Sequence, residues 1–114
     1  PDGIKKLLVR LHNLFPKMPI YITENGACYN NGPDENGKIN DVKRQEYMAL
    51  NIGSALESIS EGVNLKGYYA WSLLDNFEWA WGFSMRFGIV YVDFSTMQRI
   101  VKESGHQYRE LISR

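Results

Sequence analysis

A short run of strand-forming residues that ends at a carboxylate constrains this chain more than any other feature. Residues 20–23 (Ile-Tyr-Ile-Thr) are β-branched or aromatic, and the run is too short for a helix, so it predicts a strand. Apolar and polar residues do not alternate along it, which indicates burial on both faces, as in a parallel sheet covered by helices. Glu24 follows directly, and then the turn-forming pair Asn25-Gly26. We therefore expect Glu24 at a rigid strand end, at the mouth of a pocket.

The rest of the chain alternates between helical periodicity and short buried strands. The expected elements are helices over residues 2–15, 41–61 and 102–113 and strands over residues 67–71 and 88–93, the last being a short strand or an extended arm. Asn40 is expected to cap the second helix, and Gly62 to follow its end in a left-handed conformation. This order indicates βα units around a parallel sheet.

Two principal strands are too few to build such a sheet. Each would leave an apolar face exposed and one edge without a partner. With 114 residues the chain is long enough for one ordinary domain but not for two. We therefore expect this chain to be one sector of a larger parallel α/β body.

Composition and charge exclude several classes of function. Thirteen basic and thirteen acidic residues cancel without forming a basic stripe, so nucleic acid is not an expected partner. No apolar run approaches the roughly 18 residues that a membrane span needs, so no membrane partner is expected. The single cysteine, Cys28, forms no internal disulfide and suits a reducing compartment, which predicts a cytoplasmic location.

The same residues argue against a metal or a cofactor. No spacing links His12 or His106 to Cys28 as a metal-binding set, so we expect no metal and no cofactor. Cys28 has no histidine near it in the sequence, which favours an incidental loop thiol over a nucleophile.

An aromatic and acidic loop follows the second principal strand. Ligands of α/β proteins bind at the carboxyl ends of parallel strands, and here that edge holds Glu24 and Trp71. Further along the loop, Glu78 precedes Trp79. An aromatic ring offers a flat face to a sugar ring, and a carboxylate accepts two hydrogen bonds from adjacent hydroxyls, so this pair suits sugar binding. Each feature also has a purely structural alternative. Glu24 could be a solvated loop residue, the aromatic loop could be a hydrophobic plug under the sheet, and Asp75 could cap a turn.

Three segments resemble glycoside hydrolase family 1, the β-glucosidase family. Residues 22–26 (Ile-Thr-Glu-Asn-Gly) are similar to its nucleophile motif, and residues 71–79 (Trp-Ser-Leu-Leu-Asp-Asn-Phe-Glu-Trp) to its glycone-binding stretch. Residues 86–93 resemble the segment that follows it, although Met85 stands where many members carry lysine. The resemblance covers nearly the whole chain. It implies the C-terminal quarter of a single (β/α)8 barrel domain, residues 1–114, with strands seven and eight and their flanking helices.

The resemblance also implies roles for individual residues. Glu24 would be the catalytic nucleophile, and the glycone-binding residues would be Trp71, Glu78, Trp79 and Phe87. The implied reaction is hydrolysis of terminal β-glucosides, and of β-galactosides in some cases, by double displacement. The implied partners are the sugar substrate and the remainder of the barrel.

One half of the catalytic machinery is absent from this sequence. Retaining hydrolysis uses two carboxyl groups about 5–5.5 Å apart, and the family's acid/base lies in an Asn-Glu-Pro motif that these 114 residues do not contain. We therefore expect the chain to be inactive by itself. The alternatives are a non-catalytic carbohydrate-binding or receptor-like barrel, a small interaction protein, and a 6-phospho-β-glycosidase, whose phosphate Glu78 would repel.

Overall fold

Helices and strands alternate along the chain in the predicted order. The computed structural model describes residues 2–113. The elements are α1 (Asp2–Leu14), β1 (Ile20–Asn25), α2 (Val42–Ser60), β2 (Leu65–Ala70), the 3₁₀ turn η1 (Trp79–Trp81), β3 (Val90–Val92), β4 (Arg99–Val101) and α3 (Glu103–Ile112).

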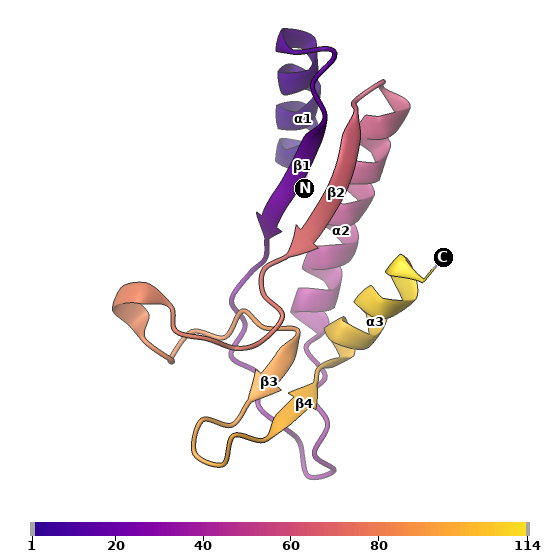
Figure 1. Cartoon of the computed structure of the whole chain (residues 1–114). Coiled ribbons are helices and arrows are strands. Elements are labelled where there is room, and N and C mark those ends of the chain that lie inside the picture. Colours follow the sequence, from indigo (N-terminus) through magenta and orange to yellow (C-terminus); the bar gives the residue numbers. More distant parts are fainter. Residues whose placement is uncertain (1, 114) are drawn as a thin grey trace.

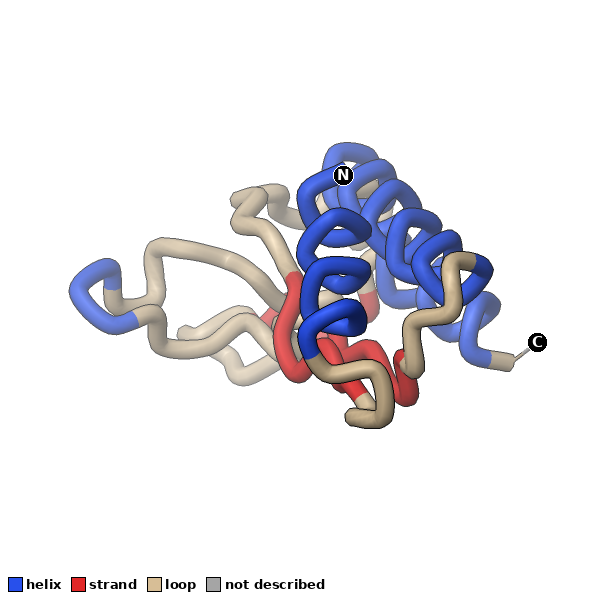
Figure 2. The backbone as a smooth tube through the Cα atoms, turned by 90° about the horizontal axis from the view of Figure 1, so that it is seen from above, coloured by secondary structure: helices blue, strands red, loops and turns tan. Residues whose placement is uncertain are grey.

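The two long strands form a parallel pair that is covered on one face. β1 and β2 are hydrogen-bonded neighbours, with Ile20 opposite Leu65. α2 connects the two strands as the crossover helix of a βαβ unit, and α1 lies on the same side of the pair (Figures 1 and 2). The predicted βα organisation is confirmed.

The core lies between the strands and these two helices. Leu8 of α1, Ala55 of α2 and Val63 are buried together, and side chains of both strands pack against them. On the opposite face Tyr21 and Tyr69 are 53% and 57% exposed. The sequence predicts strands built for burial on both faces, and within this chain only the helix-facing side is covered.

A second, smaller sheet lies beyond the ends of β1 and β2. β3 and β4 pair antiparallel, with Tyr91 opposite Ile100. The segment predicted as a strand or an arm is thus β3, which begins two residues later than predicted. Its three-residue partner β4 is not predicted from the sequence. Figure 1 shows this hairpin below the parallel pair, followed by α3 beside α2.

The ends of α2 show one correct and one wrong prediction. Gly62 has a φ of +93°, the left-handed conformation expected after the helix. Asn40 is not the cap, because Asp41 occupies the N-cap position and the amide oxygen of Asn40 accepts a bond from Gln45 instead.

The overall dimensions are those of a part rather than of a compact domain. The radius of gyration is 15.8 Å, against roughly 13 Å expected for a compact chain of this length. The accessible surface is 7545 Å², against roughly 6,400 Å² expected for a monomer of this mass. Among residues 2–113, no helix has the length and apolar character needed to cross a bilayer.

Candidate active site at the ends of the parallel strands

A β-bulge at the end of β1 determines where Glu24 points. Ile22 pairs with Tyr68 and Asn25 with Ala70, so three steps along β1 match two along β2. In a regular strand Glu24 would share the helix-facing side with Ile22. With the extra residue, Thr23 and Glu24 are both exposed, while Ile22 and Asn25 are half-buried. The bulge therefore directs Glu24 away from the helices and toward the open face of the sheet.

The ends of the two strands meet closely, as the sequence predicts for Glu24 and Trp71. The backbone N–H of Trp71 donates to the carbonyl of Asn25 at 2.8 Å. A Cβ on Gly26 would lie 1.7 Å from the carbonyl oxygen of Trp71, so only glycine fits there. Asn25-Gly26 was expected to form a turn, and this is wrong. Asn25 is the last residue of β1, and Gly26 lets the chain pass Trp71 in close contact.

Phe87 lies beside this junction. Its carbonyl accepts a bond from the N–H of Ser72 at 3.1 Å, and Ile89 N–H donates to the Ser72 carbonyl at 2.8 Å. These bonds align residues 87–90 with the segment that leaves β2, and Leu74 and Val90 continue the pairing as a parallel bridge. Phe87 and Trp71 are thereby brought to the same region of the chain.

Glu78 and Trp79 lie on a loop that projects from the strand ends. In Figure 1 this loop and η1 extend to the left of the sheet. Its turn is closed by a bond of 2.7 Å from Glu78 N–H to the Gly82 carbonyl, and the Phe77 and Phe83 rings stack edge to face at 5.5 Å. Glu78 is half-buried, whereas Trp79 is 84% exposed. That exposure contradicts a hydrophobic plug under the sheet.

Asp75 holds the base of this loop through a buried carboxylate, a role that the sequence does not predict. It was expected to cap a turn. Instead its buried carboxylate pairs with Lys102 at 2.9 Å and with Arg86 at 2.8 Å and accepts the N–H of Gly88 at 2.9 Å. Burial lowers the pKa of Lys102, and the Asp75 carboxylate opposes that shift. We call Asp75, Arg86 and Lys102 the Asp75 cluster.

A second buried ion pair ties the loop after β1 to the same region. Arg44 pairs with Asp41, and it donates to the carbonyls of Tyr29 at 3.0 Å and Arg86 at 2.7 Å. Asp41 also accepts bonds from the N–H and hydroxyl of Ser104 at the start of α3. The two long loops are therefore cross-linked to each other and to α3. The sequence carries no advance signal for this pair, because Asp41 and Arg44 stand among other charged residues such as Lys43 and Glu46.

Two positions singled out in the sequence meet at the rim of the site. The thiol of Cys28 lies 3.4 Å from the Met85 sulfur and donates to the Asn30 amide oxygen at 3.3 Å. The thiol of Cys28 is therefore surrounded by a thioether and an amide, both uncharged groups. Within residues 2–113, no cluster of three or more His, Cys, Asp or Glu side chains is placed to hold a metal ion.

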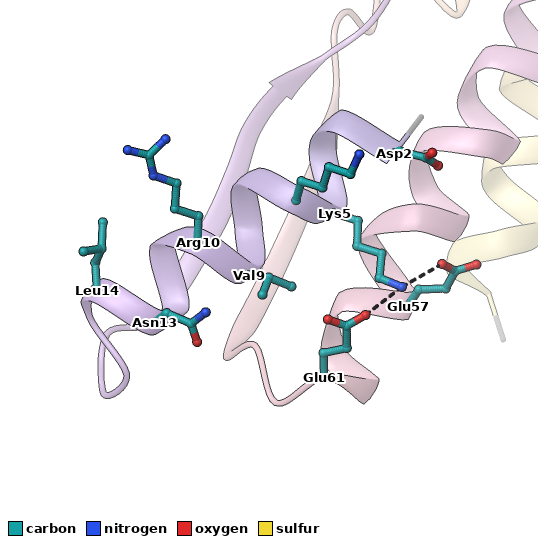
Figure 3. A pocket seen from close by; sticks show the side chains of 9 residues that line it. Asp2, Lys5, Val9, Arg10, Asn13, Leu14, Glu57 and Glu61 are labelled. Carbon is teal, nitrogen blue, oxygen red and sulfur yellow. Dashed lines mark hydrogen bonds and ion pairs between the residues drawn. The ribbon is translucent and has the colours of Figure 1, made fainter.

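Two hollows on the surface have different characters. One, of about 320 Å³, runs along the free edge of β1 beside the apolar side chains of α1, and residues from both faces of β1 line it, all six positions from Ile20 to Asn25. The other, of about 670 Å³, lies between α1 and α2 (Figure 3). In it Lys5 bridges Glu57 at 3.3 Å and Glu61 at 2.7 Å. None of the predicted site residues lines this second hollow.

Comparisons with known proteins agree with this geometry. The family model described as Glycosyl hydrolase family 1 matches residues 1–114. The chain is 50% identical over 112 residues to beta-glucosidase A of Thermotoga maritima and 49% identical to beta-glucosidase A of Acetivibrio thermocellus; each match covers 98% of this chain and 25% of the relative. The chain thus spans about a quarter of the length of these relatives.

Solved structures give the same result for the backbone. The family 1 β-glucosidase from Thermotoga maritima superposes with a TM-score of 0.97 at 50% identity, covering 99% of this chain and 26% of that one. The same protein has been solved in complex with deoxynojirimycin and with galacto-hydroximolactam. The chain therefore belongs to glycosyl hydrolase family 1 and has the fold of a segment of that family's (β/α)8 barrel.

Proposed function

We propose that this chain is the part of a retaining β-glucosidase that supplies the nucleophile and much of the glycone pocket. Glu24 is the nucleophile, and Trp71, Glu78, Trp79 and Phe87 bind the glycone. The observation that carries the proposal is the bulge at the end of β1, which turns Glu24 out of the helix layer next to Trp71. A barrel enzyme of this kind uses carboxylates at the carboxyl ends of its strands.

The reaction follows from the position of one carboxylate. An oxygen of Glu24 attacks the anomeric carbon, forming a glycosyl ester while the aglycone oxygen leaves with a proton from a second carboxyl group. Water then attacks the same carbon, the ester bond to Glu24 breaks and frees its carboxylate, and the second carboxyl group, now ionised, takes the proton of the water. That second group must come from another part of the barrel, because this chain lacks the Asn-Glu-Pro motif.

The remaining residues hold the sugar for this step. Glu78 accepts bonds from hydroxyls of the glycone, and the indole N–H of Trp79 donates to another. Trp71 and Phe87 form walls of the pocket. Residues 1–114 are the last quarter of one barrel domain, and the rest of that domain is the partner. The β-glucosidase names of the relatives and the glycoside-like inhibitors in their structures support a β-glucoside or β-galactoside substrate. A cytoplasmic location stays a prediction.

A mechanism-based inactivator tests the central assignment. The complete barrel, treated with a 2-deoxy-2-fluoro-β-glucoside, should carry one glycosyl label, and peptide mapping should place it on Glu24. Glu24→Gln should take up no label and should lose turnover by several orders of magnitude. A label on another residue, or full activity in Glu24→Gln, refutes the proposal.

A second variant separates binding from the nucleophilic step. Glu78→Ala should still be labelled at Glu24, but with weaker saturation and a lower rate, because bonds to the glycone act in both the ground state and the transition state. A barrel that binds sugars without labelling at Glu24 would belong instead to the non-catalytic class.

A further inference from the structure

The bulge beside Glu24 is tied to the neighbouring strand by a side-chain hydrogen bond. The hydroxyl of Tyr68 on β2 donates to the amide oxygen of Asn25 at 2.6 Å. Asn25 directly follows Glu24, and its own carbonyl accepts the N–H of Trp71 at 2.8 Å. The residue after the carboxylate is thus fixed through both its side chain and its backbone.

The donor in this bond is itself firmly held. The Tyr68 ring packs against the core formed by Leu8, Ala55 and Val63. Burial, with smaller contributions from Tyr47 and Tyr108, raises the pKa of its hydroxyl. The hydroxyl therefore keeps its proton at any pH at which a glycosidase works and remains a donor to Asn25.

This bond distinguishes two ways in which β1 can pair with β2. In the observed register an extra residue separates Ile22 and Asn25, and Glu24 faces away from the helices. A slip of one residue reverses the face of every side chain beyond it. Without the bulge, Asn25 would face away from Tyr68, and Glu24 would face the helices. The bond forms only when Glu24 points to the open side.

We propose that Asn25 and Tyr68 are positioning residues for Glu24, and that their hydrogen bond maintains the bulge that directs the carboxylate toward the anomeric carbon. Neither side chain touches the sugar, because both lie on the helix-facing side of the sheet. This inference rests on the proposed role of Glu24. Since a misplacement of about 1 Å costs an enzyme about a hundredfold in rate, loss of the bond should slow glycosylation of Glu24 without weakening sugar binding.

The test measures the glycosylation step by itself. The complete barrel is incubated with 2,4-dinitrophenyl 2-deoxy-2-fluoro-β-glucoside at several concentrations, which gives a limiting inactivation rate and a half-saturating concentration. Tyr68→Phe removes only the hydroxyl. We expect its limiting rate to fall roughly tenfold to a hundredfold, with the half-saturating concentration changed less than about twofold.

The chain offers a matched control on the same structural layer. The hydroxyl of Tyr108 donates to the backbone carbonyl of Tyr68 at 3.1 Å, so Tyr108→Phe also deletes a phenolic hydroxyl that bonds to this strand. Its limiting rate should stay within about twofold of the wild-type rate, even if both variants lower the melting temperature equally. A Tyr68→Phe rate equal to that of Tyr108→Phe overturns the inference.

A second substitution tests the pair. Asn25→Ala removes the acceptor, and because both changes break the same bond, the double variant should be no slower than the slower single variant. Rate losses that multiply would show independent roles and would also overturn the inference. Failure of the proposed function is distinguishable from either result, because it places the wild-type label somewhere other than Glu24.

Discussion

At the scale of single residues, the site depends on how closely two backbones approach. Gly26 passes the carbonyl of Trp71 so closely that no side chain fits between them. This approach brings the residue after β1 against the residue after β2 and so sets the distance between Glu24 and Trp71. The neighbouring residue Asn25 is held as well, because its amide oxygen accepts the hydroxyl of Tyr68.

Gly26→Ala should therefore harm the complete barrel. The new Cβ would meet the Trp71 carbonyl carbon at 2.8 Å as well as its oxygen at 1.7 Å, so the backbone must move. We expect a loss of roughly 1–3 kcal/mol in unfolding free energy, as for other overpacked sites, measured by chemical denaturation, together with lower activity.

A glycine in open surroundings is the control for this substitution. A Cβ on Gly53, inside α2, would meet nothing within 4 Å. Gly53→Ala should stabilise the protein by about 0.5–1 kcal/mol, because alanine favours the helix. Equal effects of the two substitutions would show that the close approach at Gly26 is unimportant.

The residues of the site were only partly predictable. Glu24 and Trp71 were expected together because each follows a parallel strand, and the carboxyl ends of such strands share an edge. The bulge was not foreseen, since it depends on Tyr68, which lies 43 positions from Asn25. Alternation alone would have placed Glu24 on the side of Ile22, so the correct direction required the register of the second strand.

At the scale of secondary-structure elements, buried charges hold the loops together. The Asp75 cluster joins the aromatic loop to the hairpin and to the start of α3, and the Lys102 ammonium and Asp75 carboxylate are fully buried. Such a pair is costly to break on one side, because the remaining charge stays buried without its partner.

Lys102→Met should destabilise the complete barrel by roughly 3–5 kcal/mol, measured as the shift in unfolding free energy by urea denaturation. Asp75 would keep only Arg86 as a cationic partner. Lys5→Met is the control, because Lys5 bridges two exposed glutamates between α1 and α2, and exposed pairs contribute little. A similar loss of unfolding free energy in both variants would show that the buried ion pair contributes no more to stability than the exposed one.

The β3–β4 turn predicts a dependence on pH. The hydroxyl and N–H of Ser95 donate to Asp93, and with Thr96 they lower the pKa of Asp93 from 3.8 to about 2. The ionised carboxylate therefore stabilises the turn fully above about pH 5, and this contribution is lost as the pH falls from there through about 2.

Asp93→Asn removes this contribution. The difference in denaturation midpoint between wild type and variant should be constant above pH 5 and should shrink below pH 4. A difference that stays the same down to pH 3 would contradict this assignment.

The prediction of elements succeeded where periodicity or burial was strong. The long helix α2 and the two parallel strands were foreseen because their patterns are local. β4 has only three residues, and nothing in Arg99–Val101 marks it as a strand without β3 beside it. The prediction of the α2 cap failed for a related reason, because Asp41 takes the N-cap position while its carboxylate bonds Ser104, 63 positions away, and the Arg44 side chain instead of a helix N–H.

At the scale of the whole molecule, the chain exposes surfaces that a complete barrel would cover. Tyr21, Tyr69 and the hollow along β1 are open, and the surface area exceeds that of a compact monomer of this mass. These observations match a segment that spans about a quarter of its relatives.

The isolated chain should consequently behave as a loosely packed or aggregating species. We expect binding of a hydrophobic dye, a broad thermal transition and no turnover of aryl β-glucosides, followed by recovery of activity when the remainder of the barrel is coexpressed. A sharp, cooperative transition of a monomer without dye binding would contradict this expectation and favour an independent interaction protein.

The two free edges of the parallel pair differ from each other. One belongs to β1 and the other to β2, and both strands run in the same direction. Copies of the isolated chain that continue the parallel sheet, with β1 of one copy against β2 of the next, must therefore join head to tail, whereas two like edges can pair only antiparallel in a closed dimer. Head-to-tail addition ends only when a ring closes and otherwise continues as a filament. The polymers of this segment should accordingly show a broad distribution of lengths instead of one preferred size.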